Sequence, residues 1–112
     1  MAPDKTSEIV PNLGEFVAIQ SQSIVSKTVF AGEHAKVVLM ALDAGQELSE
    51  HTAAMPAVIH ILEGTSRIGL GGEVHELGSG AWIHMPANLR HSVRAITPTK
   101  LLLTLFKTAR TA

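Results

Sequence analysis

Short apolar and β-branched runs, separated by glycine, proline and polar residues, recur along most of the chain. Strands with turns at intervals of roughly 8–12 residues are typical of a β-sandwich or barrel. No stretch of useful length repeats its apolar residues with the period of an amphipathic helix. The pattern predicts an all-β chain, with strands at 16–20, 24–30, 35–42, 66–70, 73–76, 91–96 and 100–107.

Two of these runs, 35–42 and 101–106, are apolar at both alternating positions. One face of a strand in a small sandwich normally meets water, so a second layer must cover the outer face here. We expect a partner copy in a homodimer to supply that layer. The alternative is that the amino-terminal arm of the same chain covers it.

Two stretches follow a common plan. Gly45 is followed by His51, a proline-broken bend and an alternating apolar run that ends in Glu63-Gly64. After Gly80 come a short apolar strand, a Pro-Ala-Asn bend and His91 at the start of the next strand. Two such units can bring the two histidines together in an apolar interior, where each ring needs a hydrogen-bond or metal partner.

These stretches resemble the two motifs of the cupin superfamily, with every spacing kept. The positions of the first motif are Gly45, His51, Ala53, Ala57 and Gly64, and those of the second are Gly80, Pro86, Asn88, His91 and Ala95. The resemblance implies an all-β double-stranded β-helix, or jelly-roll barrel, as a single domain. We place the barrel at residues 15–112, after an amino-terminal arm at 1–14.

The same resemblance implies a metal site with a depleted ligand set. The family's usual shell is three histidines and one glutamate, but two of these four positions are Ala53 and Ala57 in this chain. His51 and His91 remain as the candidate metal ligands. The ion would be divalent zinc, iron, nickel or manganese, or copper, since imidazole suits several first-row metals.

Two further histidines and one carboxylate are supplementary candidates. His84 would look inward if its parity on strand 81–86 faces the barrel, which the sequence leaves open. Alternation turns His60 away from the cavity unless a bulge intervenes. Glu47 shares the parity of His51 and is a more distant candidate. His34 and His75 are expected on the solvated surface.

The predicted cavity is apolar, because Ala53 and Ala57 replace two larger side chains. Candidate lining residues are Met40, Met55, Met85, Trp82, Phe106 and Ile59. An apolar pocket with a few convergent polar groups is the default site for a small-molecule ligand.

Composition excludes several other functions. The net charge of −1 over 112 residues offers no basic field for nucleic acid or for an anionic membrane surface. The chain has no cysteine, which excludes disulfides and thiolate chemistry. Its amino terminus lacks the apolar stretch of a secretory signal, so we expect a cytoplasmic protein.

Three interpretations follow. The first is a small metal-binding cupin, with oxygenase- or isomerase-type chemistry if it is an enzyme. The second is a metal-free module that binds a small molecule, as a sensor or carrier. The third is a dimeric scaffold without catalysis. The sequence assigns no catalytic residue and no substrate.

Overall fold

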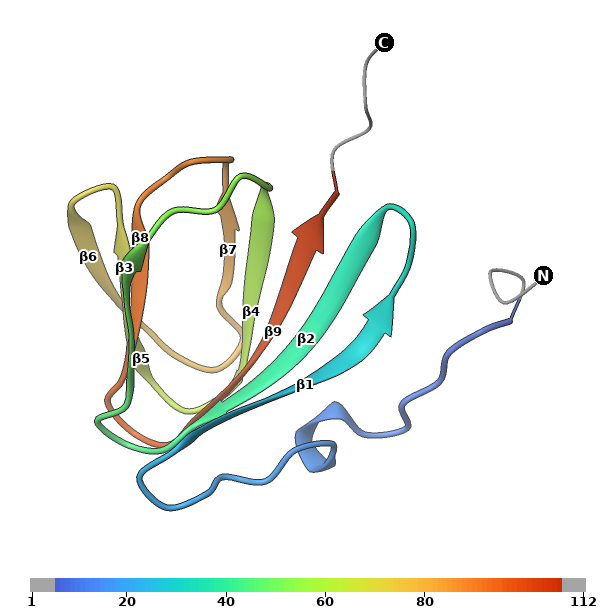
Figure 1. The fold of residues 1–112 in the computed structure, drawn as a ribbon. Helices are drawn as coiled ribbons and strands as arrows, with labels where there is room; N and C mark the ends of the chain where they lie inside the picture. Colours follow the sequence, from blue (N-terminus) through green and yellow to red (C-terminus); the bar gives the residue numbers. More distant parts are fainter. Residues whose placement is uncertain (1–5, 108–112) are drawn as a thin grey trace, which may run out of the picture.

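The computed structural model describes residues 6–107, which form two antiparallel sheets that face each other (Figure 1). The strands are β1 (Ile24–Ala31), β2 (Ala35–Leu42), β3 (Glu47–His51), β4 (Ala57–Glu63), β5 (Ser66–Leu70), β6 (Glu73–Leu77), β7 (Trp82–Met85), β8 (His91–Ala95) and β9 (Thr99–Phe106). A short 3-10 helix, Leu13–Glu15, precedes them. In the described part of the chain, no helix is long and apolar enough to cross a membrane.

The strand order joins segments that are distant in sequence. One sheet has the order β1-β2-β9-β4-β7 and the other has β3-β8-β5-β6. The chain crosses between the sheets at the β2–β3, β3–β4, β4–β5, β6–β7, β7–β8 and β8–β9 connections, as in a jelly roll. The predicted all-β double-stranded architecture is therefore confirmed.

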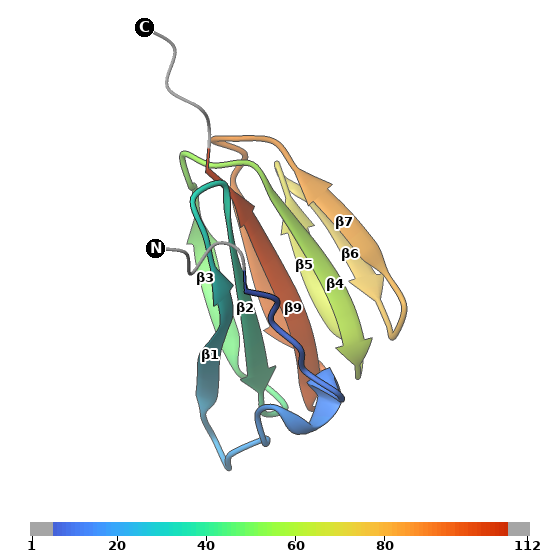
Figure 2. The same ribbon diagram turned by 90° about the vertical axis from the view of Figure 1, so that its right-hand side faces the viewer.

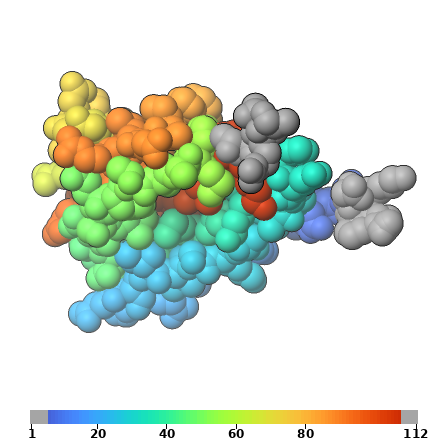
Figure 3. Space-filling view, turned by 45° about the horizontal axis from the view of Figure 1, so that its top comes forward, coloured from blue at the N-terminus to red at the C-terminus, as the bar shows by residue number. Residues whose placement is uncertain are grey.

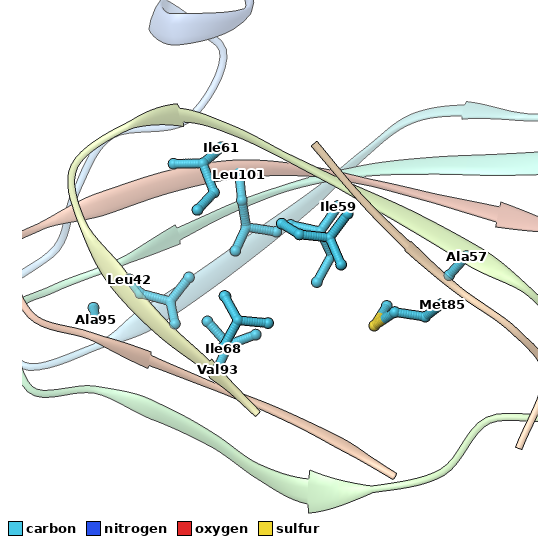
Figure 4. Close-up of a cluster of buried hydrophobic side chains, with 10 residues drawn as sticks. Leu42, Ala57, Ile59, Ile61, Ile68, Met85, Val93, Ala95 and Leu101 are labelled. Atoms are coloured by element: carbon cyan, nitrogen blue, oxygen red, sulfur yellow. The ribbon is translucent and has the colours of Figure 1, made fainter. Parts of the chain in front are cut away.

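The core lies between the sheets and follows the alternation of the strands. Ile59 and Ile61 on β4 point inward, as do Ile83 and Met85 on β7, because successive side chains leave opposite faces of a strand. Figure 4 shows the buried cluster of Leu42, Ala57, Ile59, Ile61, Ile68, Ile83, Met85, Val93, Ala95 and Leu101. Complete burial of each large aliphatic side chain contributes about 1.5–3 kcal/mol.

A buried polar contact joins the two sheets at one end of the barrel. The hydroxyls of Ser66 and Thr99 lie 2.9 Å apart, and both residues are fully buried. Gly64 has a φ of 89°, and a Cβ there would lie 2.1 Å from the carbonyl oxygen of Pro98. Only glycine fits this close approach of the two connections.

The amino-terminal segment covers part of the outer face of the five-stranded sheet (Figure 2). Val17 is buried against Leu39 and Ala41, while Lys27 lies over the ring of Phe16 at 4.3 Å from its centroid. The second layer expected over strand 35–42 is thus supplied in part by the same chain. The predicted strand at 16–20 is wrong, since these residues form turn and coil that pack by side chains without joining a sheet.

The rest of that outer face is open in the single chain. Trp82 is 66% exposed and Phe106 is 42% exposed. The outward positions around them hold no aspartate, glutamate, lysine or arginine; they are Val58, His60, Trp82, His84, Thr104 and Phe106. A patch with large aromatic side chains and none of these charged groups fits a second copy of itself.

The predicted domain division extends beyond the described residues at both ends. The parts outside them are residues 1–5 of the arm and residues 108–112 of the barrel domain. The boundary that we placed at residue 14 stays a prediction.

A carboxylate fixes the turn before β1 against the end of β2. Asp43 accepts hydrogen bonds from the backbone N–H groups of Gln22, at 2.8 Å, and Ala44, at 2.9 Å. These donors, Gln22 first, hold the pKa of the Asp43 carboxyl below its ordinary value. Gln22 itself has a φ of 53°, so the carboxylate holds a turn residue in the left-handed region.

The first prediction concerns this carboxylate. Asp43→Ala should lower the melting temperature at neutral pH, because two backbone donors lose their acceptor. Since the folded-state pKa is lowered, the stabilisation is present above the unfolded-state pKa and is lost as pH falls through the folded-state value. Thermal melts from about pH 7 to about pH 3 should show the variant converging with the wild type. A gap of constant size would contradict the assignment.

The second prediction concerns this outer patch around Trp82, which we propose is covered by a second copy. Light scattering should give about twice the mass of one 11.9 kDa chain. Trp82→Glu should shift the mass toward one chain, because it places a charge in an apolar interface. Val74→Glu is the matched control, since Val74 is 68% exposed but lies on the other sheet. A wild-type monomer would disprove the proposal.

Candidate functional site

The two histidines of the predicted pair meet at the ends of neighbouring strands. β3 ends at His51 and β8 begins at His91, and the two residues are directly opposite in the strand register. Their ring centroids lie 4.2 Å apart, with the planes tilted by 60°. His51 is exposed and His91 is half-buried, so the pair lies at the mouth of the barrel. The structure thus brings together the two residues selected from the sequence.

An irregularity in β3 places His51 beside His91. Leu48 pairs with Val93 and His51 pairs with His91, so β3 spans three residues where β8 spans two. Leu48 packs on the core, and strict alternation from it would turn His51 to the outer face. A β-bulge restores the inward direction. Glu47 therefore does not share the direction of His51, and its selection as a candidate ligand was wrong.

Each imidazole is fixed by a carbonyl two residues earlier in its own strand or loop. The Nδ1 atom of His51 lies 2.8 Å from the oxygen of Ser49, and that of His91 lies 2.9 Å from the oxygen of Leu89. A carbonyl oxygen can only accept, so both Nδ1 atoms carry the proton. In the neutral rings, the lone pair then lies on Nε2, which leaves both Nε2 atoms available as acceptors or ligands.

Two loops frame this mouth. Residues 52–56 connect β3 to β4, and residues 86–90 connect β7 to β8. The N–H of Asn88 donates to the carbonyl of Ala53 at 2.7 Å, which ties the loops together. Asn88 has a φ of 69°, a left-handed conformation that asparagine adopts more readily than most residues. Figure 3, with this end brought forward, shows the two connections side by side in green and orange.

The interior residues at the same end of the barrel as the histidine pair are apolar. Ala57 opens β4 and Met85 closes β7, and these two residues pair with each other across the strands. Both face the interior and are almost fully buried, at 3% and 2% exposure. Ala57 also pairs with Leu105, a partly buried residue that packs on the core. Ala53, the second alanine at a ligand position, lies in the loop 52–56 rather than on a strand.

The supplementary histidines lie elsewhere. Since Ile83 and Met85 face inward, His84 points outward, which settles the parity that the sequence left open. His60 pairs with Trp82 on the same outer face, as alternation predicted. The structure does not bring His60 or His84 to the His51–His91 pair. His34 and His75 are exposed, as expected.

The residues expected to line a cavity lie in different places. Met85 and Ile59 face the interior as members of the packed core, and Met40 packs on the same cluster. The expectation is wrong for Trp82 and Phe106, which point outward because their parity is that of the exposed face. Met55 is half-buried in the loop 52–56.

Charged side chains stay on the outside of this end. Glu47 accepts a hydrogen bond from Arg94 at 3.2 Å, and Glu50 lies 3.9 Å from Arg90. Each of these side chains is about half exposed, so neither pair places a charge in the barrel. Within residues 6–107, no three histidine, cysteine, aspartate or glutamate side chains gather closely enough to hold a metal ion. The described residues therefore provide two imidazoles at this end, without a third ligand of these types.

A separate hollow lies on the other side of the molecule. It has a volume of about 980 Å³ and lies between the amino-terminal segment, at Thr6 and Glu8, and the β1–β2 hairpin. Phe30 and His34 line it, and the histidine pair does not. This hollow belongs to the outer face described above rather than to the candidate site.

Two parts of the site were missed from the sequence. These are the bulge in β3 and the two carbonyl acceptors at Ser49 and Leu89. The sequence held one signal for the bulge. Leu48 and His51 are three residues apart, so regular alternation cannot direct both side chains into the interior. The carbonyl acceptors carry no side-chain signature and could not be found from residue types.

The comparison with known proteins agrees with this geometry. The model of the cupin domain family matches residues 38–106. An RmlC-like cupin from Desulfovibrio desulfuricans is 33% identical, with a TM-score of 0.78 over 88% of this chain and 95% of that one. A conserved protein of unknown function from Streptococcus pyogenes is 27% identical, with a TM-score of 0.84 over 94% and 92%.

A cupin superfamily protein from Desulfitobacterium hafniense has a TM-score of 0.82 over 88% of this chain and 90% of its own, at 16% identity, which supports the fold alone. No protein with curated annotation matches the sequence. The family model covers most of the barrel, including both histidines and both mouth loops. The chain therefore belongs to the cupin domain family.

Proposed function

We propose that this cupin binds a first-row transition-metal ion at the mouth of its barrel through the Nε2 atoms of His51 and His91. The observation that carries the proposal is the pair of Nδ1 contacts to backbone carbonyls, which directs both lone pairs to Nε2. Metal-binding histidines almost always donate their other N–H to such an acceptor, which fixes the tautomer and the orientation of the ring. The two rings are thus organised as ligands before any ion arrives.

A site with only two protein ligands leaves several coordination positions for water or for a small molecule. Catalytic zinc sites usually have three protein ligands, and non-haem iron sites have two histidines and a carboxylate. This site has one protein ligand fewer than either. His51 is exposed, which makes the open positions accessible from solvent. A bound ion would polarise a carbonyl or acidify a water there.

A second candidate function is metal-free binding of a small organic molecule. The observation that favours it is the apolar wall of Ala57, Met85 and Leu105 beside two polar imidazole edges. A ligand with one hydrogen-bonding group and a short apolar part matches this surface. At a hundredfold excess over the dissociation constant, such a ligand would stabilise the fold by about 2.7 kcal/mol, and it would do so after chelation of metals.

The third prediction concerns the tautomers. In metal-free protein at mildly alkaline pH, nitrogen-15 spectra of the histidine rings should show protonated Nδ1 and unprotonated Nε2 for His51 and His91. The exposed ring of His34 is the internal reference, since its Nδ1 has no carbonyl partner among the described hydrogen bonds. Protonated Nε2 at either site residue would remove the basis of the metal proposal.

The fourth prediction concerns metal binding. Titration of chelator-treated protein with zinc or nickel should show about one site per chain. His51→Ala and His91→Ala should each weaken binding at least tenfold, because each removes half of the protein ligands. His60→Ala and His84→Ala are the matched controls on the outer face, and should bind as the wild type does.

Two results would contradict this prediction. One is the absence of saturable binding of every first-row ion to the folded wild-type protein. The other is loss of binding in the outer-face variants with retention in the His51 and His91 variants, which would move the site to the other side of the sheet.

A further inference from the structure

We propose that the metal site is selective for monovalent copper, with the thioether of Met85 as a third ligand beside His51 and His91. The inference rests on the proposed function, because it names the ion and one further ligand of the same site. Three features of the mouth carry it: the absence of a carboxylate, the position of Met85 and the neutral apolar wall.

The first feature is the shortage of hard donors. The family glutamate position is Ala57, and the nearby carboxylates of Glu47 and Glu50 pair with arginines on the outside. Calcium, magnesium and manganese prefer oxygen ligands, and zinc and iron sites usually have at least three protein donors from nitrogen, oxygen or thiolate. Residues 6–107 offer no such group of three. An ion that accepts few and soft ligands fits better.

The second feature is the position of a sulfur atom. Met85 is the last residue of β7, faces the interior at 2% exposure and pairs with Ala57. Figure 4 shows its sulfur in the space between the sheets, on the side of Val93 and Ile68 and turned away from Ala57. β8, which carries His91, begins only six residues later.

The same end of the barrel therefore holds two imidazoles and one thioether. His51 ends β3, His91 begins β8 and Met85 ends β7, and the hydrogen bond between Asn88 and Ala53 holds their connections together. The thioether is a soft ligand that favours monovalent copper, and imidazole accepts copper among several first-row ions. Methionine is unbranched and has three rotatable side-chain bonds, so its sulfur can adjust toward an ion.

The third feature is the charge that the site can accept. The Born cost of transferring an ion out of water grows with the square of its charge, so a monovalent ion costs one quarter as much as a divalent ion of equal size. Neutral imidazoles and a neutral thioether do not reduce the charge of the ion. Next to the buried surfaces of Ala57 and Met85, the monovalent state is favoured.

The test compares two metals and three methionines. Metal-free protein is titrated without oxygen with monovalent copper against bicinchoninate, and separately with zinc. Met85→Leu is nearly isosteric and should keep the fold. It should weaken copper binding at least tenfold and change zinc binding less than twofold. Met40→Leu is the matched control, because Met40 also packs on the core but pairs with Leu101 in the body of the sheet.

A spectroscopic measurement makes the assignment independent of affinity. X-ray absorption at the copper edge should detect one sulfur neighbour in the wild type and in Met40→Leu, and none in Met85→Leu. Unchanged copper affinity in Met85→Leu, or loss of the sulfur signal in Met55→Leu instead, would overturn the role of Met85.

The outcomes separate this inference from the function on which it rests. Zinc binding that requires both histidines, together with copper binding indifferent to Met85→Leu, would leave the metal site in place and refute the copper assignment. Failure of both metals to bind the folded wild type would refute both proposals.

Discussion

Both sheets must direct one set of alternating side chains into a shared interior. The rest of this structure depends on that requirement. A strand has only two faces, so each inward residue commits its neighbours to the outside. On β7 this rule buries Ile83 and Met85 and leaves Trp82 and His84 exposed. On β3 the rule would turn His51 away from His91, but a bulge between Leu48 and His51 places the two histidines opposite each other. The site thus depends on one local exception to the alternation.

The bulge explains why the fold was easier to predict than the site. Strands 35–42 and 66–70 were predicted with their observed ends, because apolar runs and glycine turns mark them directly. The motif spacing also indicated that His51 and His91 would meet. In contrast, the orientation of Glu47 was wrong, since a parity count assumes an unbroken ladder between it and His51. The number of residues between two positions does not reveal whether a ladder contains an extra one.

The predicted strand at 16–20 failed for a different reason. Phe16, Val17 and Ile19 are apolar because they cover the outer face of another sheet, and that role requires no backbone ladder. An apolar pattern indicates which side chains are buried. It does not indicate which partners form the hydrogen bonds of their backbone. The same limit applies to Trp82 and Phe106, whose size favoured an interior position although their parity places them outside. The size and polarity of a side chain indicate that it is buried, whereas the strand topology decides which surface covers it.

The two ends of the barrel are held together by different contacts. At one end the buried hydroxyls of Ser66 and Thr99 meet, while the His51–His91 pair lies at the opposite end. The loops 52–56 and 86–90 begin or end beside these histidines, and a hydrogen bond from the N–H of Asn88 to the carbonyl of Ala53 joins the two loops. A substitution that breaks this bond would therefore act on the histidine pair through the backbone, without altering either imidazole.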